Sequence, residues 1–275
     1  MNLLNVQNLR VTYHRPGQKP VDAVRGVSFA LRQGESLGIV GESGCGKSSL
    51  AKAIIGLQPP SAGSLHFEGQ DLADMGAADS RRYRRSVQMI FQDAAGSLNP
   101  RMTVQQTLEE VLRVHRLAPA GQAPGRVREL LELVGLPESV LGAFPREISG
   151  GQCQRVSIAR CLALEPKLIL ADEPVSALDV SVQARILNLI RSLQTRLHLA
   201  VILISHDLAV VRNICDRVAV MCAGEFVEYG PAAQVLDAPK HAYTRELLAA
   251  VPDVGRALAQ GRPVTRSNDP TRSAP

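Results

Sequence analysis

Apolar and polar positions follow different periods in successive parts of the chain. Residues 3–11 and 27–31 alternate loosely, which predicts two short strands on either side of a turn-rich stretch at 15–20. The apolar run at 36–40 then enters a glycine-rich turn. Residues 48–56 have helical spacing that a glycine and a Pro-Pro pair bring to an end. This part of the chain therefore predicts short strands, then a helix that follows a glycine-rich turn.

The middle of the chain changes to helical spacing. Residues 104–117 and 127–134 each predict a helix, and a Gly/Pro/Ala-rich stretch at 118–125 predicts a linker between them. We interpret about 97–160 as a helical subdomain inserted into the rest of the fold.

Strands and helices alternate in the second half. Apolar runs at 168–172 and 201–205 predict buried strands, and 87–91 is a similar run earlier in the chain. Residues 180–197 and 207–215 predict the intervening helices. Alternation of this kind indicates a parallel sheet covered on both faces, so the expected fold class is α/β.

Composition fits one large folded domain with subdomains. The 275 residues are 45% hydrophobic and 21% charged, and the formal net charge of +5 is modest for this length. Aromatic residues are scarce, with 5 Phe, 4 Tyr and no Trp, which argues against a single-strand nucleic-acid binder built on stacking platforms. We therefore expect no nucleic-acid partner.

The sequence argues against three classes of protein: membrane-spanning, secreted and metal-binding. No apolar run reaches the roughly 18–20 residues of a membrane helix, and the N-terminus lacks the pattern of a secretory signal. The cysteines number 5, an odd count without a CxxC pair, which favours a reducing compartment. The 6 histidines lack HxH or HExxH spacing, so a metal site built by the protein alone is not expected.

The glycine-rich turn at 41–48, GESGCGKS, matches GxxxxGK[ST] and lies between a predicted strand and a predicted helix. Such a loop turns backbone N–H groups around a phosphate at a helix N-terminus. Lys47 is expected at the edge of an open site, reaching the β- and γ-phosphates, and Ser48 is expected to ligate Mg²⁺. Cys45 is expected to be a reactive thiol. The predicted nucleotide-binding residues of the loop are Gly41, Glu42, Ser43, Gly44, Cys45, Gly46, Lys47, Ser48 and Ser49.

Acidic and polar residues follow the apolar runs. Asp172 and Glu173 end LILADE, where Asp172 would act through Mg²⁺ and Glu173 would be the general base. Gln92 and His206 also come directly after apolar runs, and the carboxyl ends of parallel strands meet at one sheet edge. His206 is a candidate for polarising the γ-phosphate, and Gln92 for contacting Mg²⁺ or water.

A second candidate anion site lies at the start of another predicted helix. Ser149, Gly150, Gly151 and Gln152 precede a helix that Pro166 ends, and they present backbone N–H groups at its first turn. Since one nucleotide does not need two anion sites, we expect this surface to serve a nucleotide held by another copy.

Together these residues resemble the ATP-binding subunits of ABC transporters. The matches are Walker A at 41–48, the Q-loop at Gln92, the signature ISGGQ at 148–152, Walker B at 168–173, the D-loop at 176–179 and the switch histidine at His206. Tyr13 stands where the family's aromatic residue stacks on adenine, although a core tyrosine would look the same. The resemblance implies an ABC-type ATPase with a RecA-like core, an N-terminal antiparallel β subdomain and the inserted helical subdomain.

Three stretches are similar to the peptide and nickel importer group of that family: FQDAAGSLNPRMTV at 91–104, EPVSALDVSVQA at 173–184 and HAYTRELLAAVP at 241–252. This implies a cassette over 3–236 and a C-terminal extension over 237–275. From about Asp253 the extension is rich in Arg, Pro, Ser and Ala with little to bury, which predicts a mobile tail. The group's usual Pro is Ala242 here, and the tail lacks the cysteine cluster that some members carry.

The resemblance also implies the setting. Two such subunits, identical or related, would sandwich ATP and Mg²⁺ and power integral membrane permeases at the cytoplasmic face of a bacterial inner membrane, served by a solute-binding protein. Residues 93–103 are the expected permease contact. The cargo would be peptides, or alternatively nickel or a metal chelate. A soluble ABC ATPase acting on ribosomes or DNA is the alternative from another class, but the chain shows neither a second cassette nor a long coiled-coil insertion.

Overall fold

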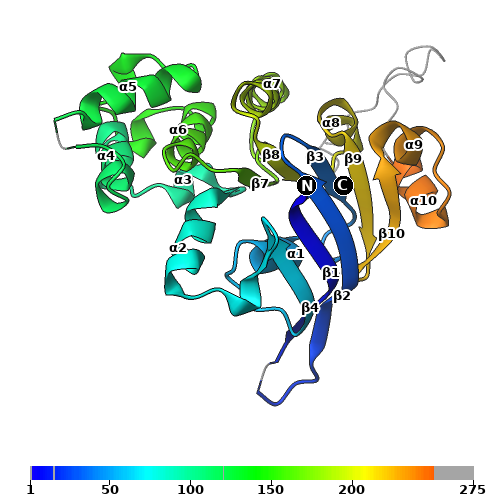
Figure 1. Cartoon of the computed structure of the whole chain (residues 1–275). Coiled ribbons are helices and arrows are strands. Elements are labelled where there is room, and N and C mark those ends of the chain that lie inside the picture. Colours follow the sequence, from blue (N-terminus) through cyan, green and yellow to red (C-terminus); the bar gives the residue numbers. More distant parts are fainter. Residues whose placement is uncertain (1, 15, 120, 251–275) are drawn as a thin grey trace, which may run out of the picture.

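The computed structural model describes residues 2–14, 16–119 and 121–250. Strands in these ranges form two sheets, and helices cover the larger one (Figure 1). The expected mobile tail belongs largely to 251–275, which lies outside the described residues. The α/β class with an antiparallel N-terminal sheet and a parallel core sheet is confirmed.

The smaller sheet is antiparallel and has the order β2-β1-β4-β5. Its strands are β1 (Asn2–Tyr13), β2 (Val21–Arg32), β4 (Ala62–Phe67) and β5 (Gln70–Asp71). The two long strands β1 and β2 extend well beyond the predicted 3–11 and 27–31. Periodicity misses their outer ends, because the turn that joins them and the neighbouring residues are solvent-exposed and polar.

The larger sheet has the order β10-β9-β3-β8-β7-β6. Its strands are β3 (Ser36–Val40), β6 (Val87–Ile90), β7 (Leu168–Asp172), β8 (Ala200–Ile204), β9 (Arg217–Cys222) and β10 (Glu225–Pro231). All pairs are parallel except β9 with β10. The carboxyl ends of β3, β6, β7 and β8 therefore lie at one edge.

Alternate residues of the parallel strands enter two different cores. Ile169 and Val201 pack in the core on the side of the large helices, whereas Leu170 and Ile202 pack with the small sheet and the first helix. Burial on both faces explains why these strands read as continuous apolar runs rather than alternating ones.

The helices around the large sheet include α1 (Lys47–Ile54), α6 (Gly150–Leu162), α7 (Val180–Leu197) and α8 (Leu208–Ile214). Helix α8 lies so close to β3 that a Cβ on Gly38 would be 2.2 Å from the Val211 Cγ1. This close packing fixes α8 against β3, so the loops that leave the carboxyl ends of β3 and β8 start from defined positions.

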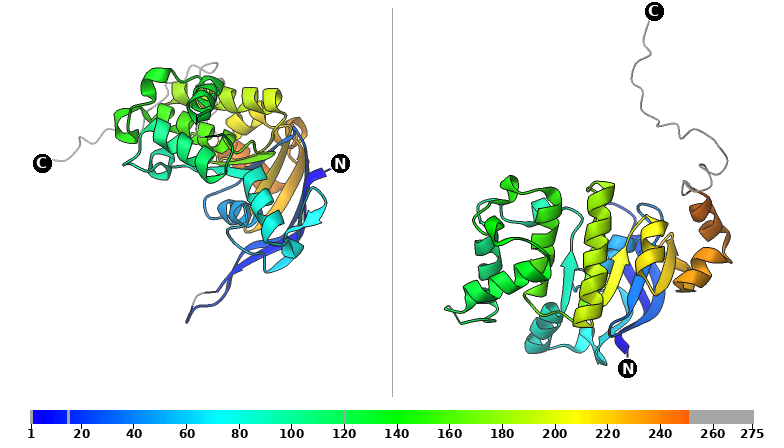
Figure 2. Two further views of the ribbon diagram at one scale, coloured as in Figure 1. Left: turned by 60° about the vertical axis from the view of Figure 1, so that its left-hand side comes forward. Right: turned by 90° about the horizontal axis from the view of Figure 1, so that it is seen from above.

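Between β6 and β7 the chain is mainly helical, and this part forms one end of the molecule (Figure 2). Besides α6 it contains α3 (Ala94–Ser97), α4 (Val104–Val114) and α5 (Ala123–Leu133). Two boundaries differ from expectation. Helix α4 ends at Val114, before Arg116 adopts a φ of +53°, and α5 begins inside the predicted linker because its first turn accommodates Pro124.

The remaining helices flank the sheets. They are α2 (Ala77–Ser86), α9 (Ala232–Asp237), α10 (Ala242–Ala250) and the short 3-10 turns at Leu72–Asp74, Glu138–Val140 and Pro145–Glu147. Helices α9 and α10 follow β10 at the opposite end of the molecule from α5 (Figure 1). No helix in the described ranges is both long and apolar enough to cross a bilayer.

Candidate functional site

The glycine-rich turn connects β3 to α1 and is enclosed by two other strands. Gly46, the residue before α1, has a φ of +112°, and a Cβ there would be 2.2 Å from the Ala23 carbonyl oxygen on β2. A Cβ on Gly41 would be 2.1 Å from the Met221 carbonyl oxygen on β9. Both positions require glycine, because the loop is held between these backbones.

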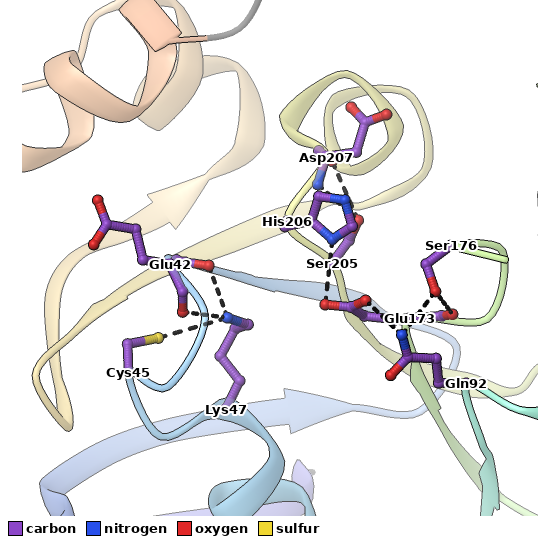
Figure 3. Close-up of polar contacts among 10 residues, drawn as sticks. Glu42, Cys45, Lys47, Gln92, Glu173, Ser176, Ser205, His206 and Asp207 are labelled. Atoms are coloured by element: carbon purple, nitrogen blue, oxygen red, sulfur yellow. Dashed lines mark hydrogen bonds and ion pairs between the residues drawn. The ribbon is translucent and has the colours of Figure 1, made fainter. Parts of the chain in front are cut away.

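The sequence predicts Lys47 at the edge of an open site, but the structure buries its side chain, and the residue is only 6% exposed. Its Nζ donates to the carbonyl oxygens of Gly41 and Glu42, both at 2.7 Å, and lies 3.7 Å from the Cys45 Sγ (Figure 3). Cys45 is likewise buried, at 8% exposed, which limits the access of a reagent to the thiol that the sequence predicts to be reactive. The ammonium group is satisfied by the loop itself in this state, because the loop carbonyls turn toward it.

Asp172 at the end of β7 lies beside the first turn of α1. Burial raises the pKa of its carboxyl group, and Glu173 adds to this, while a hydrogen bond from the Ser48 hydroxyl and the nearby Lys47 ammonium oppose it. A carboxylate and a hydroxyl oxygen thus meet at the glycine-rich turn. Hard oxygen donors of this kind, completed by phosphate oxygens, suit Mg²⁺.

Glu173 is the centre of a polar cluster from three strand ends (Figure 3). One carboxylate oxygen lies 3.2 Å from His206 Nδ1, and the other accepts a hydrogen bond of 3.3 Å from Gln92 Nε2. Gln92 also donates to the Ser176 hydroxyl at 3.1 Å. The side chain of Glu173 is 23% exposed. The structure therefore brings together three residues that the sequence placed only by strand order.

Backbone geometry fixes the directions of these side chains. Glu173 has a φ of +45°, unusual for a residue with a side chain, and its N–H donates to the Ile204 carbonyl on β8 at 2.9 Å. Asp207 caps α8 by accepting from the Ala209 N–H at 2.8 Å, so His206 stands at the corner between β8 and α8. The left-handed residue is Glu173, directly after β7, and strained backbone of this kind clusters at functional sites.

The segment Ser149–Gln152 starts α6 in the helical part of the fold, and α6 lies apart from α1 (Figure 1). The Ser149 hydroxyl accepts from the Gln152 N–H at 3.3 Å, and the Gln152 side chain accepts from the Ser149 N–H at 2.9 Å. This capping box satisfies two backbone donors, so Gly150 and Gly151 are left to offer theirs. A Cβ on Gly151 would be 2.6 Å from Val182 Cγ1, which keeps the start of α6 close to α7.

Tyr13 ends β1 and is partly buried among the residues of the small-sheet core. It pairs with Val21, two residues from Ala23, whose carbonyl faces Gly46. The structure thus places Tyr13 on the strands that flank the glycine-rich turn. Position alone does not separate an adenine contact from a core role, so the adenine contact stays a prediction.

Two residues at the site were given no individual role from the sequence, although Ser176 begins the D-loop match at 176–179. Ser176 bridges Gln92 and the carbonyl oxygen of Glu173, at 3.1 and 3.2 Å. The Tyr243 hydroxyl on α10 accepts a hydrogen bond of 3.1 Å from the Glu42 N–H. Both lie in stretches with a family resemblance, but a contact over 201 residues of sequence leaves no periodic signal.

Family comparisons match two parts of the chain. Residues 24–176 match the model described as ABC transporter. Residues 227–274 match the model described as oligopeptide/dipeptide transporter, C-terminal region.

Curated relatives resemble almost the whole chain. The oligopeptide transport ATP-binding protein OppF of Lactococcus lactis is 45% identical over 258 residues, covering 92% of this chain and 81% of that protein. OppF of Salmonella typhimurium is 50% identical over 235 residues, covering 85% and 70%. The oligopeptide transport ATP-binding protein AppF of Bacillus subtilis is 48% identical, covering 84% and 71%.

Solved structures share the fold. The ATP-binding cassette MJ0796, in a dimeric post-hydrolysis state with ADP and Pi, has a TM-score of 0.74 at 29% identity and covers 83% of this chain and 98% of its own. CbiO1 of Clostridium perfringens, described as part of the ABC transporter complex cbiONQ, has a TM-score of 0.78 at 28% identity, covering 94% and 99%.

Proposed function

The chain belongs to the ABC transporter family as an ATP-hydrolysing cassette, and on that basis we propose that it powers the import of peptides through a membrane permease. The observation that carries the proposal is the convergence of Gln92, Glu173 and His206 beside the glycine-rich turn. These side chains come from three different strand ends, at the edge where ligands bind in parallel sheets.

In this proposal the glycine-rich turn and α1 bind ATP. The loop N–H groups and the start of α1 would hold the phosphates, while Lys47 exchanges the carbonyls of Gly41 and Glu42 for phosphate oxygens. Since the ammonium already lies within the loop, this exchange needs a change of side-chain direction rather than a refolded backbone. Tyr13 is the proposed partner of the adenine ring.

Asp172 and Ser48 would hold Mg²⁺, with Gln92 as a further contact once it leaves Ser176. The fit rests on the adjacent carboxylate and hydroxyl oxygens and on the burial of Asp172. When bound, Mg²⁺ neutralises negative charge on the β- and γ-phosphates.

Glu173 is the proposed general base. Its carboxylate would take a proton from water as the water oxygen attacks the γ-phosphorus, and the bond to the bridging oxygen breaks to release ADP and phosphate. In the resting state both carboxylate oxygens are engaged, by His206 and Gln92. His206 would turn toward the γ-phosphate when nucleotide arrives, which frees one oxygen of the base for water.

A second cassette would complete the site. Ser149, Gly150 and Gly151 lie at the start of α6, a helix that Figure 1 shows apart from α1, which follows the glycine-rich turn. Ser149 and Gly150 are solvent-exposed, and their segment presents N–H groups at a helix start. These features support a sandwich in which Ser149–Gln152 of one subunit contacts the nucleotide held by the other, and dimeric cassettes occur among the similar structures.

Residues 93–103 are the proposed permease contact. Most of this segment is exposed, it follows Gln92 directly, and the large apolar side chain of Phe91 beside it is 40% exposed. A groove of about 800 Å³ next to it is lined by Arg101, Met102 and residues of α4 and α5. Movement of Gln92 during nucleotide exchange would therefore reach this surface directly.

Peptide cargo is supported by the relatives named for oligopeptide transport and by the match of 227–274. Peptides are therefore the favoured cargo. The protein would act at the cytoplasmic face of a bacterial inner membrane, with a solute-binding protein delivering cargo to the permease.

The test is ATP hydrolysis by Glu173→Gln, with Glu225→Gln, an exposed residue outside the polar cluster, as a matched control. Glu173→Gln should still bind ATP but hydrolyse it about 10²–10⁴ times more slowly, the usual contribution of acid–base catalysis. Glu225→Gln should behave as the parent. With the permease in vesicles, parent protein should drive peptide uptake. Parent-like hydrolysis by Glu173→Gln would refute its role as base.

A further inference from the structure

The C-terminal extension reaches the nucleotide site through one side chain. Tyr243, in the first turn of α10, accepts a hydrogen bond from the Glu42 N–H at 3.1 Å. Tyr243 is partly buried, whereas Glu42 is exposed at its side chain. The contact therefore joins α10 of the C-terminal extension to the beginning of the phosphate-binding loop.

The peptide group that Tyr243 contacts is also the one that holds Lys47. The N–H of Glu42 and the carbonyl of Gly41 belong to the same planar unit, and that carbonyl accepts from Lys47 Nζ at 2.7 Å. The two polar ends of a trans peptide point in opposite directions. Tyr243 and the Lys47 ammonium therefore lie on opposite sides of it, and the tyrosine leaves the phosphate side of the loop free.

The other hydrogen bonds at this point engage carbonyl oxygens: Lys47 Nζ donates to those of Gly41 and Glu42, and the Cys45 N–H donates to that of Glu42 at 3.3 Å. The glycine before Glu42 has a φ of +153°, near the limit of the region that favours glycine, and it carries no side chain that anchors the turn. Close approach of the Met221 carbonyl restrains Gly41 from one side. The Tyr243 hydroxyl supplies the hydrogen bond that orients the next N–H.

Tyr243 is itself held in place. The Glu228 carboxylate on β10 accepts the N–H groups of Lys240 and His241 at 2.9 and 3.1 Å. His241 Nδ1 in turn accepts the Tyr243 N–H at 3.2 Å. Burial alone would raise the pKa of Glu228, but the hydrogen bonds from the Lys240 and His241 N–H groups and the nearby His241 side chain outweigh it and lower the pKa. The start of α10 is thus fixed to the large sheet before it meets the loop.

We propose that Tyr243 is a positioning residue for ATP binding, which orients the Gly41–Glu42 peptide and thereby links the C-terminal extension to the phosphate-binding loop. This inference rests on the proposed function, in which Lys47 and the loop bind ATP. A preorganised loop pays less ordering cost when phosphate arrives. The extension therefore tunes ATP affinity without touching the nucleotide, and displacement of α10 would weaken binding.

Tyr243→Phe tests this, because it removes the hydroxyl and keeps the ring. ATP should bind about 2- to 12-fold more weakly, the effect of one ordinary hydrogen bond, so KM for ATP should rise by that factor while kcat changes little. The matched control is Tyr229→Phe in β10, whose hydroxyl donates to the Ala30 carbonyl at 3.4 Å. That variant should keep the parent KM.

A second measurement reports on the loop directly. Amide hydrogen exchange of a peptide spanning 36–44 should speed up in nucleotide-free Tyr243→Phe but not in Tyr229→Phe. Parent-like KM or unchanged exchange in Tyr243→Phe overturns the inference. If the parent fails to bind ATP, or Lys47→Ala binds it normally, the proposed function fails instead, so the two failures are distinguishable.

Discussion

Replacement of Lys47 by Ala probes the resting and the nucleotide-bound states together. In the resting state the variant loses the Nζ hydrogen bonds to Gly41 and Glu42, both 2.7 Å long. Charge-assisted hydrogen bonds contribute about 1.5–3 kcal/mol each. Removing the buried ammonium also removes its desolvation cost of several kcal/mol, which offsets much of the loss of these hydrogen bonds. Water can hydrate the freed carbonyl oxygens. We expect a net loss of about 1–2 kcal/mol of unfolding free energy.

The nucleotide-bound state loses a phosphate contact as well. One charge-assisted hydrogen bond corresponds to a factor of about 10–150 in affinity. Lys47→Ala should therefore bind ATP that much more weakly while remaining folded. Lys52→Ala is the matched control, because Lys52 lies on the same helix but is exposed.

Urea unfolding and titration with a fluorescent ATP analogue measure both effects. A shift of about 1–2 kcal/mol should appear in Lys47→Ala, and Lys52→Ala should stay within about 0.5 kcal/mol of the parent. Two results refute the reasoning. Unchanged stability would mean that the buried ammonium contributes nothing to the loop, and unchanged ATP affinity would remove Lys47 from phosphate binding.

Two further predictions concern packing and thiol chemistry. Gly38→Ala should destabilise the protein by about 1–3 kcal/mol, because the new Cβ would lie 2.2 Å from Val211 Cγ1. The control Gly125→Ala in α5 has open space around it and should stabilise the protein by up to about 1 kcal/mol. Equal urea midpoints for the two variants would contradict the packing of α8 on β3. Burial raises the pKa of Cys161 to about 11 and that of Cys215 to about 12, so both stay protonated at pH 8, and iodoacetamide should label the half-buried Cys222 first in the native protein. Mass spectrometry of the modified peptides checks this, and rapid labelling of Cys161 before unfolding would contradict it.

Much of the fold follows from local pattern. The runs at 168–172 and 201–205 predict buried strands because both their faces meet apolar layers, and strand order then predicts that Gln92, Glu173 and His206 share an edge. The structure confirms the strands and the proximity of these residues. Their chemical roles stay predictions, as do those of Tyr13 and Ser149–Gln152.

Other features depend on contacts that no local pattern contains. The burial of Lys47 follows from the way β2 and β9 enclose the loop at Ala23 and Met221. Strand β4 pairs with β1 and strand β9 pairs with β3, both distant in sequence, and α10 meets Glu42 only after β10 has placed it. Such contacts require the assembled tertiary structure, which is why the sequence predicted an open lysine and no role for Tyr243.

In the proposed mechanism Glu173 is the general base for ATP hydrolysis, in a sandwich completed by Ser149 of a second subunit. Size-exclusion chromatography of Glu173→Gln with and without ATP, alone and mixed with a candidate sister ATPase, tests it most directly. ATP should shift Glu173→Gln to the dimer, and adding Ser149→Arg should abolish the shift while ATP binding persists. Ser139→Arg, at another exposed serine of the helical part, is the matched control and should leave the dimer intact. A Glu173→Gln protein that binds ATP but stays monomeric with either partner would contradict the account.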